Sequence, residues 1–386
     1  MGERKESNHL IRDHWILCSD MEFINKAHKG KVVVGMSGGV DSSVAAYLLK
    51  EEGFEVTGVT MQIWQNEERY DCSLEGGCCG MSAVEDARRV AHMLDIPYYV
   101  MNFREEFNDK VICYFISEYL SGRTPNPCIA CNRYVKWESL LKRSLAIGTD
   151  YIATGHYARI ERLNNGRYAI RNSVTAAKDQ TYALYNLTQE QLKHTVMPVG
   201  DYTKEEIRGI AEKIGLYVAN KPDSMEICFV PDNDYAGFIE RHCDGGIQEG
   251  NFVDKDGKVL GRHKGITHYT VGQRKGLGLA MGHPVFVTEI RPDTNEVVIG
   301  DNEQILKKIV ICDNINYMAE QEIDENKIYT AKIRYNHRGA ACHLKRNDDK
   351  LYVEFEEPVR AATPGQALVV YAGEYVAMGG TIIDSM

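Results

Sequence analysis

The sequence has no long hydrophobic run and no secretory signal. Its longest apolar stretches, such as residues 31–36, are far shorter than the roughly 18 residues needed to span a bilayer. Residues 1–15 are rich in charged and polar side chains and contain no apolar core of the kind that a signal peptide has. We therefore expect no membrane contact, a flexible extension over residues 1–30, and a protein of the cytoplasm.

The chain also has no overall excess of positive charge. Its 386 residues carry a formal net charge of −10, which argues against a protein that binds nucleic acids through its bulk charge. A local basic face is enough for RNA binding, however, and two segments contain no Asp or Glu, residues 262–275 and residues 331–346. A single basic run is more typical of a solvated strand surface, so on their own the two segments leave both interpretations open.

The paired cysteines of a secreted framework are missing too. The cysteine count of 11 is odd and no export signal accompanies it, so a structural disulfide framework is not expected. Reduced thiols, some of them reactive or metal-binding, fit better. A lone cysteine is ordinarily a small buried apolar residue. We expect that role for Cys18, Cys113, Cys243, Cys312 and Cys342, and assign no role to Cys72, Cys78 and Cys79.

What is present is the composition of a globular protein, with 44% apolar and 26% charged residues, and a length that suits two or three domains. The first two thirds of the chain alternate between strand and helix patterns. Buried strands are predicted over residues 31–36, 54–61, 98–103 and 151–154, and helices over residues 42–52, 82–94, 105–120 and 134–147. This alternation predicts an α/β domain with a parallel sheet covered by helices on both faces.

The pattern changes near residue 220. A last helix over residues 204–214 begins with a capping box, in which Thr203 precedes Glu206 by one helical turn. Short alternating runs separated by turn residues follow, which is typical of a small β-barrel. We therefore predict three domains: an α/β domain over residues 31–220, a small central domain over residues 221–300 and a C-terminal β-barrel over residues 301–386.

The most specific motif joins the first strand to the first helix and reads Gly35-Met-Ser-Gly-Gly-Val-Asp-Ser-Ser43. Its glycines let backbone N–H groups wrap an anion, and the N-terminus of the following helix adds partial positive charge. Serine hydroxyls can donate further hydrogen bonds, and Asp41 is placed to hold Mg²⁺ beside phosphates. The motif lacks the Gly-Lys-Ser/Thr of a Walker loop, and its glycine spacing is not that of the dinucleotide fingerprint. We therefore predict a phosphate-binding loop of another type.

Residues 37–42, Ser-Gly-Gly-Val-Asp-Ser, resemble the PP-loop of N-type ATP pyrophosphatases. By this resemblance the protein is expected to cleave ATP to AMP and pyrophosphate and to leave the adenylate on an oxygen of its substrate. The motif is shared by amide- and C–N-forming ligases and by tRNA-thiolating enzymes, so it leaves the acceptor open.

Further motifs narrow the resemblance. In chain order they lie at residues 122–133, 153–157, 178–180, 227–229 and 268–278. Together they make the chain similar to the tRNA-specific 2-thiouridylases, the MnmA/TrmU family, from about residue 31 to the C-terminus. The resemblance implies an ATP- and Mg²⁺-dependent sulfurtransferase that adenylates O2 of the wobble uridine in tRNAs for Lys, Glu and Gln and then replaces that oxygen with sulfur. It implies tRNA and a sulfur-donor relay or cysteine desulfurase as partners, and we expect a monomer.

The resemblance also assigns site residues. Cys131, expected at the start of a helix, matches the nucleophile, and Cys228 matches the cysteine that carries a persulfide. In the family's scheme the Cys228 persulfide attacks the adenylated carbon and Cys131 attacks that sulfur, which leaves a Cys131–Cys228 disulfide for an external reductant. The positions matched to ATP are Gly35, Met36, Ser37, Gly38, Gly39, Val40, Asp41, Ser42, Met61 and Gly155. The positions matched to the target base and the rest of the tRNA are Asn126, Pro127, Cys128, His156, Lys178, Asp179, Gln180, Arg334, Tyr335 and Gln366.

Cys128 departs from the commoner family pattern, which has at this position an Asp that is assigned general acid/base duty. In one interpretation Cys128 is a bystander or a weak acid/base, and persulfide chemistry proceeds through Cys131 and Cys228. In the other, the three thiolates ligate a 4Fe–4S cluster whose fourth iron binds hydrosulfide. The sequence does not decide between them. The rival assignments, an amide-forming PP-loop ligase and a catalytically idle RNA-binding protein, have no use for Cys131 and Cys228.

Overall fold

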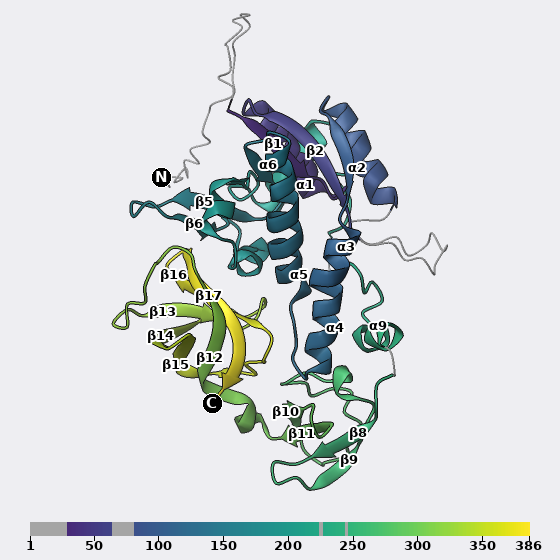
Figure 1. The fold of residues 1–386 in the computed structure, drawn as a ribbon, viewed down its shortest axis with the longest axis vertical. Helices are drawn as coiled ribbons and strands as arrows, with labels where there is room; N and C mark the ends of the chain where they lie inside the picture. The colour runs from purple at the N-terminus through teal and green to yellow at the C-terminus, as the bar shows by residue number, and fades with distance from the viewer. Residues whose placement is uncertain (1–28, 64–80, 224–226, 244–245) are drawn as a thin grey trace, which may run out of the picture.

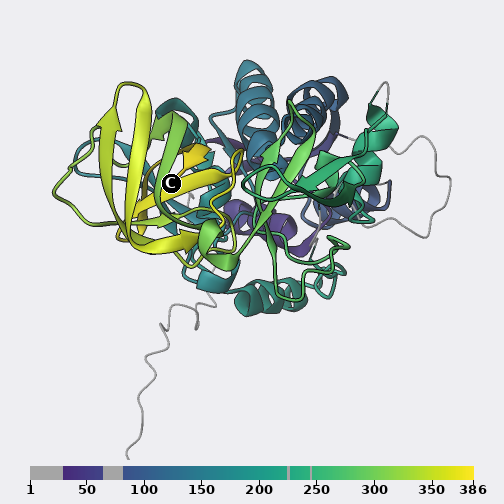
Figure 2. The ribbon, with the colours of Figure 1, turned by 90° about the horizontal axis from the view of Figure 1, so that it is seen from below.

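The computed structural model describes residues 29–63, 81–223, 227–243 and 246–386. Figure 1 shows three parts: an α/β part that contains the N-terminal elements, a β-barrel at the C-terminal end, and a smaller β part that lies between them in sequence. Figure 2, seen from below, shows the barrel to one side of the helices of the α/β part. No helix in the described ranges is both long and apolar enough to cross a membrane. The expected extension over residues 1–30 lies outside the described residues, apart from its last two.

The α/β part is built on a parallel sheet of five strands in the order β3-β2-β1-β4-β7. The strands are β1 (Lys31–Gly35), β2 (Glu55–Gln62), β3 (Tyr98–Asn102), β4 (Tyr151–Ala153) and β7 (Thr195–Val196). Val32 and Val34 of β1 contribute to one apolar core and Val33 to another, because successive side chains of a strand point to opposite faces. The predicted parallel sheet with two covered faces is confirmed.

Helices cover both faces of this sheet. The core that contains Val32 and Val34 packs against α1 (Val40–Glu51), α2 (Met81–Met93) and α8 (Lys204–Lys213). The core that contains Val33 packs against two long helical runs. The first run is α3 (Arg104–Phe107), η2 (Asn108–Ile112) and α4 (Cys113–Leu120), and the second is α5 (Pro127–Ala130), η3 (Cys131–Leu140) and α6 (Leu141–Ala146). The capping box predicted for α8 is present, with both hydrogen bonds formed between Thr203 and Glu206.

The second helical run begins earlier than the predicted residue 134. Asn126 caps the helix, because its side-chain oxygen accepts hydrogen bonds from the N–H groups of Cys128 at 3.1 Å and Ile129 at 3.4 Å. Pro127 then occupies the first helical position, where its missing N–H costs nothing. The expectation that Cys131 stands at the start of a helix is therefore wrong, since Cys128 lies in the first turn and Cys131 lies one turn further on.

The C-terminal part is a closed barrel of six strands in the order β12-β15-β14-β13-β16-β17, and β12 also pairs with β17. The strands are β12 (Leu306–Tyr317), β13 (Tyr329–Lys332), β14 (Ala340–Asn347), β15 (Lys350–Arg360), β16 (Ala367–Ala372) and β17 (Tyr375–Ser385). Alternate residues along these strands, such as Leu351, Val353 and Phe355, are fully buried inside the barrel. The predicted C-terminal β-barrel is confirmed.

A hairpin of the α/β part extends the sheet of the barrel. Its strands β5 (Ala158–Arg162) and β6 (Tyr168–Asn172) pair with each other, and β6 also pairs with β17, where Arg171 lies opposite Tyr375. The two domains thus share one sheet, which the sequence analysis did not anticipate.

The smaller β part has four strands in the order β10-β11-β8-β9 around a small apolar core. The strands are β8 (Gly250–Val253), β9 (Val259–His263), β10 (Phe286–Arg291) and β11 (Glu296–Gly300), and α9 (Tyr235–His242) precedes them. The short helices are η4 (Ala176–Lys178), η5 (Thr181–Leu184), α7 (Gln189–Lys193), η6 (Ile266–His268) and η7 (Asn302–Ile305). Contacts between η6 and α4 join this part to the first helical run.

Arg167 fastens the β5–β6 hairpin to the barrel. Its guanidinium donates hydrogen bonds to the carbonyl oxygens of Met318 at 2.6 Å and Tyr317 at 2.5 Å. Because a hydrogen bond from a charged donor contributes about 1.5–3 kcal/mol, we expect Arg167→Ala to destabilise the protein by about 2 kcal/mol. Thermal unfolding followed by circular dichroism should show a lower midpoint for this variant. Arg162→Ala, an exposed change in the same hairpin, is the control, and equal midpoints for the two variants would contradict the role of Arg167.

Candidate active site

The predicted phosphate-binding loop lies between β1 and α1. Gly38 has a φ of +70°, and a Cβ atom at this position would lie 2.4 Å from the carbonyl oxygen of Ala83, so only glycine fits. Gly39 is the N-cap residue of α1 and no side chain caps this helix. The first N–H groups of α1 therefore remain available to a ligand, and together with the helix dipole they form an anion site.

Serine side chains fix the shape of this loop from within. The Ser42 hydroxyl accepts a hydrogen bond from the N–H of Ser37 at 3.1 Å and donates to the carbonyl oxygen of Gly39 at 3.2 Å. The buried Ser43 hydroxyl donates to the same carbonyl at 2.8 Å. These bonds hold the loop in its curved form before any ligand enters.

Gly155 and Met61, both predicted to contact ATP, lie just after β4 and near the end of β2. A Cβ atom at Gly155 would lie 2.6 Å from the backbone nitrogen of Ser42 and 2.7 Å from the carbonyl carbon of Asp41, so the two backbones can approach only because residue 155 is glycine. Met61 is half-buried and borders the apolar core on one face of the sheet. Both positions are at carboxyl ends of parallel strands, where sheets of this kind bind ligands.

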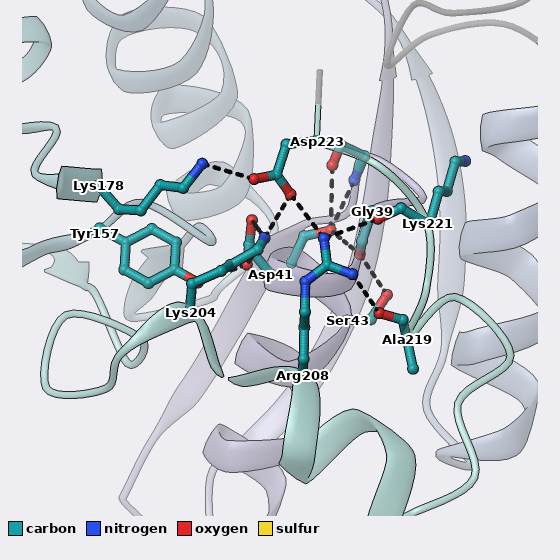
Figure 3. Close-up of polar contacts among 12 residues, drawn as sticks. Gly39, Asp41, Ser43, Tyr157, Lys178, Lys204, Arg208, Ala219, Lys221 and Asp223 are labelled. Atoms are coloured by element: carbon teal, nitrogen blue, oxygen red, sulfur yellow. Dashed lines mark hydrogen bonds and ion pairs between the residues drawn. The ribbon is translucent and has the colours of Figure 1, made fainter. Parts of the chain in front are cut away.

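Two side chains from distant parts of the chain hold Asp41 (Figure 3). Lys204 Nζ lies 2.7 Å from Oδ1 and 2.8 Å from Oδ2 of Asp41, and the Tyr157 hydroxyl donates to Oδ1 at 2.7 Å. Lys204, the first residue of α8, is 7% exposed, and a buried ammonium group is stable only when it is paired. Burial, reinforced by the charge of Asp41, raises the pKa of Tyr157, so its hydroxyl keeps the proton that it donates.

Asp223 lies on the other side of Lys204, with Oδ1 2.7 Å from its Nζ. Asp223 also pairs with Lys178 at 2.8 Å and with Arg208 at 3.5 Å. Burial works to raise the pKa of the Asp223 carboxyl, but the hydrogen bonds from Lys178 and Lys204 outweigh it and hold this pKa below its usual value.

The charged cluster is the name we give to these side chains: Asp41, Tyr157, Lys178, Lys204, Arg208 and Asp223. It contains three cations and two carboxylates, so its net charge is 3 − 2 = +1. An excess positive charge thus lies directly beside the anion-binding loop. It favours a ligand that carries more than one negative charge.

The segment that follows α8 is anchored on the same loop. Lys221 Nζ donates to the carbonyl oxygen of Gly38 at 3.1 Å and lies 2.6 Å from a carboxylate oxygen of Asp86. Arg208 donates to the carbonyl oxygen of Ala219 at 3.0 Å. The chain therefore passes over the phosphate-binding loop shortly before it reaches Cys228.

The cysteines of the predicted sulfur chemistry lie at one apolar core. Cys128 is exposed in the first turn of α5, whereas Cys131 and Cys228 are half-buried. Cys131 and Cys228 both pack against the core that contains Ile129 and Phe229. The fold therefore brings the two predicted sulfur-transfer residues to the border of the same core.

A metal centre at these cysteines has no support. In the described ranges, no group of three or more His, Cys, Asp or Glu side chains is arranged to hold a metal ion. Cys128, Cys131 and Cys228 all lie within those ranges, so the three thiolates that a 4Fe–4S cluster requires do not converge in this structure.

Two of the five cysteines that were expected to be buried apolar residues are fully buried. Cys312 and Cys342 are buried in the barrel, and burial raises the pKa of both thiols, which keeps them protonated and inert. Cys243 is half-buried. Cys113 is exposed at the start of α4, so its expected burial is wrong. Cys18, Cys72, Cys78 and Cys79 lie outside the described residues.

The three consecutive residues predicted to contact tRNA mostly brace their own turn. Lys178 belongs to the charged cluster. The Asp179 carboxylate accepts a hydrogen bond from the N–H of Ser173 at 2.8 Å, and the Gln180 side-chain oxygen accepts one from the N–H of Tyr157 at 2.8 Å. Only Lys178 therefore presents a charge that an RNA phosphate can share.

His156 is half-buried and neutral. Its Nδ1 lies 2.6 Å from Thr154 Oγ1, and its ring packs against Trp137 with the centroids 5.5 Å apart. Burial lowers the pKa of His156 well below its usual value, so the imidazole carries no charge at neutral pH. A contact from His156 to RNA would be a hydrogen bond or a stacking contact and not a charge pair.

Tyr335, which follows β13 of the barrel, lies beside the turn at residues 178–180. Its hydroxyl donates to the backbone carbonyl of Asp179 at 3.2 Å, and the residue is 42% exposed. Burial raises the pKa of Tyr335, and the charges of Asp179 and of an ionised Cys128 act in the same direction. Tyr335 therefore contacts the turn at residues 178–180.

Gln366 and Arg334 have structural partners in the barrel region. Gln366 Nε2 donates to the carbonyl oxygen of Thr124 at 2.8 Å, and the N–H of Thr124 donates to the carbonyl oxygen of Pro364 at 2.8 Å. These bonds fix the segment that leads into α5. Arg334 donates to the carbonyl oxygen of Arg360 at 2.8 Å.

Sequence reasoning missed most of the charged cluster. Lys204 was visible only as the residue after the predicted helix cap Thr203. Nothing local distinguishes Lys204 or Asp223 from surface charges. Tyr157 does close a motif that was noticed, Ala-Thr-Gly-His-Tyr at residues 153–157. The place of Tyr157 in that motif is the one local signal that points to a missed member of the charged cluster.

Three family models match consecutive parts of the chain. They describe a tRNA methyl transferase HUP domain at residues 30–232, a tRNA methyl transferase PRC-barrel domain at residues 236–301 and an aminomethyltransferase beta-barrel domain at residues 307–383. The structure has a parallel sheet with an anion-binding loop before α1, a small β domain and a closed barrel. Together these features define a three-domain protein of the PP-loop class.

Curated relatives identify the family within that class. A protein of Lachnoclostridium phytofermentans named tRNA-specific 2-thiouridylase MnmA is 67% identical over 354 residues, which cover 92% of this chain and 99% of the relative. Proteins of the same name from Clostridioides difficile and Clostridium perfringens are 54% and 56% identical over 94% and 93% of this chain and 100% and 99% of their own lengths. The chain belongs to the tRNA-specific 2-thiouridylase MnmA family.

Among solved structures, a 4-thiouridine synthetase in complex with RNA and ATP is 21% identical, with a TM-score of 0.33 over 53% of this chain and 46% of that one. This likeness is too weak to carry an argument.

Gly155 offers a direct test of the loop geometry. Gly155→Ala places a methyl group against the backbone at Asp41 and Ser42, so the loop must shift, and we expect the rate of AMP formation to fall at least tenfold and stability to fall by about 1–3 kcal/mol. Gly209→Ala in α8 is the matched control, because no atom lies within 4 Å of a Cβ there and alanine favours the helix. Wild-type AMP formation by Gly155→Ala would show that the loop does not bind the nucleotide in this form.

Proposed function

We propose that this protein uses ATP to place sulfur on C2 of the wobble uridine in tRNAs for Lys, Glu and Gln. One observation carries the proposal. The anion-binding loop before α1, whose N-terminal N–H groups have no side-chain cap, lies beside the positively charged cluster, and the same α/β domain brings Cys131 and Cys228 to the border of one apolar core. The high identity to relatives named 2-thiouridylases supports the choice of substrate. An amide-forming ligase would need the loop but not the two cysteines.

The first step is adenylation. Uridine O2 attacks the α-phosphorus of ATP, the bond to the β-phosphate oxygen breaks, and pyrophosphate leaves. The N–H groups at the start of α1 and the cations of the charged cluster stabilise the negative charge that develops on pyrophosphate. Lys204 and Lys178 thereby stabilise negative charge on the phosphates, as the lysine of a Walker loop does in other nucleotide-binding proteins. Asp41 supplies the hard carboxylate oxygen that would hold Mg²⁺, which when bound neutralises phosphate charge.

The second step is sulfur transfer. The terminal sulfur of a Cys228 persulfide attacks C2 of the adenylated uridine, and AMP leaves. The Cys131 thiolate then attacks the sulfur of Cys228 and the new sulfur stays on uridine, so that a Cys131–Cys228 disulfide forms. An external thiol reductant restores both cysteines, and a cysteine desulfurase or a relay protein recharges Cys228. We derive no step through a 4Fe–4S cluster, because the three cysteines do not converge as ligands.

The remaining residues hold the tRNA. Asn126 and Cys128 lie at the start of α5, where they would face the target base, and Tyr335 and Lys178 border the same region. We also propose the domain division at residues 220 and 300, a monomeric enzyme, and a cytoplasmic location, which keeps the cysteines reduced between turnovers.

The decisive experiment incubates the protein with ATP, a sulfur source and undermodified tRNA and measures 2-thiouridine by mass spectrometry. We expect 2-thiouridine from the wild type, none from Cys131→Ala or Cys228→Ala, and a substantial fraction of wild-type activity from Cys128→Ala, because Cys131 and Cys228 carry the sulfur. Cys113→Ala, an exposed thiol outside the site, is the control.

Two results would contradict this proposal. AMP formation that depends on a small acid instead of tRNA would indicate a ligase. Complete loss of thiolation in Cys128→Ala, together with about four irons per chain in anaerobically purified wild-type protein, would indicate the cluster mechanism.

Lys204 tests the charged cluster. Lys204→Met removes the buried ammonium group, so we expect tRNA-dependent AMP formation to fall on the order of 100-fold. The affinities for ATP and pyrophosphate should fall more than the affinity for AMP, because AMP lacks the phosphates that the cluster faces. Lys213→Met, at the exposed far end of α8, is the control. An equal loss of affinity for ATP and AMP would mean that Lys204 only supports the fold.

A further inference from the structure

One surface of the central domain is not used by the proposed reaction. The central loop, residues 274–285, leads into β10 and lines an open concavity of about 540 Å³. Three of its glycines, Gly276, Gly278 and Gly282, have φ values between +69° and +77°, and no atom of another segment packs against Gly278 or Gly282. Figure 1 shows β8–β11 at the opposite end of the molecule from β1, so this loop is not part of the nucleotide site.

The backbone of the central loop has unused hydrogen-bond donors. In the described part of the chain, the N–H groups of residues 276–283 donate to no backbone or side-chain acceptor. Backbone N–H groups without protein partners must face solvent or a ligand. Successive N–H groups in glycine-rich turns form concave sites that bind anions. The loop therefore has the chemistry of a phosphate-binding surface.

Charge favours the same ligand. The chain has no Asp or Glu between Asp256 and Glu289, although its net charge is −10. Arg274 and Lys275 are exposed at the start of the central loop and have no acidic partner among the described residues. Two acids near this region pair with side chains outside the loop, Glu249 with Arg262 at 3.6 Å and Glu240 with His268 at 3.4 Å. Asp301 pairs with His283 of the loop itself at 3.3 Å and leaves Arg274 and Lys275 unpaired among the described residues.

The central loop is also continuous with the surface predicted to contact tRNA. A Cβ atom at Gly272 would lie 2.5 Å from the Cβ of Ala361 in the barrel, so the two domains touch immediately before the loop. The neighbouring residue, Arg360, accepts the hydrogen bond from Arg334. A polyanion that contacts Arg334 can therefore reach Arg274 without leaving the protein surface.

We propose that the central loop, with Arg274, Lys275 and the N–H groups of residues 276–283, binds the phosphate backbone of the tRNA away from the nucleotide that is modified. The inference rests on the proposed function, because it takes tRNA as the polyanion. Phosphate contacts of this kind position the RNA and carry no sequence information. They would fix how the tRNA lies across the enzyme while the anticodon enters the active site.

Salt dependence of tRNA binding tests the two cations. We expect Arg274→Ala with Lys275→Ala to remove two phosphate contacts, so the slope of log affinity against log salt should become shallower by about 1.4–1.8. Lys255→Ala with Lys258→Ala is the matched control, because it removes the same charge from an exposed turn of the same domain that also carries Asp254 and Asp256. Equal slopes for the two double variants would overturn the proposal, provided that both unfold at the wild-type temperature.

Hydrogen exchange of the wild-type protein tests the backbone donors. Amides of residues 276–283 should exchange rapidly in the free protein and become protected when tRNA is added, and ATP alone should not protect them. Protection by ATP alone, or none with tRNA, would overturn the proposal. Failure of the proposed function and failure of this inference give different results. A wild-type protein that binds tRNA but forms no 2-thiouridine refutes the proposed function. An enzyme that thiolates tRNA while the amides of the central loop stay unprotected refutes only the inference.

Discussion

The site depends on one buried ammonium group. Lys204 lies between the carboxylates of Asp41 and Asp223. Loss of its ammonium group would leave Asp41 without a cationic partner among the described residues, whereas Asp223 would keep Lys178 and Arg208. Asp41 belongs to the phosphate-binding loop, whereas Asp223 precedes Cys228 by five residues, a reach of no more than about 18 Å. The phosphate-binding loop and the segment that leads to Cys228 are therefore linked through the same buried lysine.

The segment before Cys128 depends in turn on both β domains. On one side Gln366 and Pro364 of the barrel bond to Thr124, and on the other a Cβ atom at Gly122 would lie 3.0 Å from Ile290 of the central domain. The position of Cys128 in the first turn of α5, and of Cys131 one turn further on, depends on the residues that precede them. The two β domains thus position the start of the helical run that contains Cys128 and Cys131.

The sequence predicted what periodicity and local motifs encode. The buried valines of β1, the loop at residues 35–43 and the capping box of α8 depend on neighbours along the chain, and each was recognised. The pairing of Lys204 with Asp41 joins residues 163 positions apart, and a single sequence gives no sign of it. The start of α5 was missed for another reason: Asn126 and Pro127 were assigned only as target-base contacts by the family resemblance, although together they cap a helix and begin it.

The sheet shared by β6 and β17 also affects how the chain is made. β6 is synthesised about two hundred residues before β17, and until the last strand emerges from the ribosome one edge of the hairpin has no partner. An unpaired edge is a template for pairing with other chains. The β5–β6 hairpin therefore gains its last strand partner only when the C-terminus has been made, and a chain that ends before β17 leaves that sheet edge open.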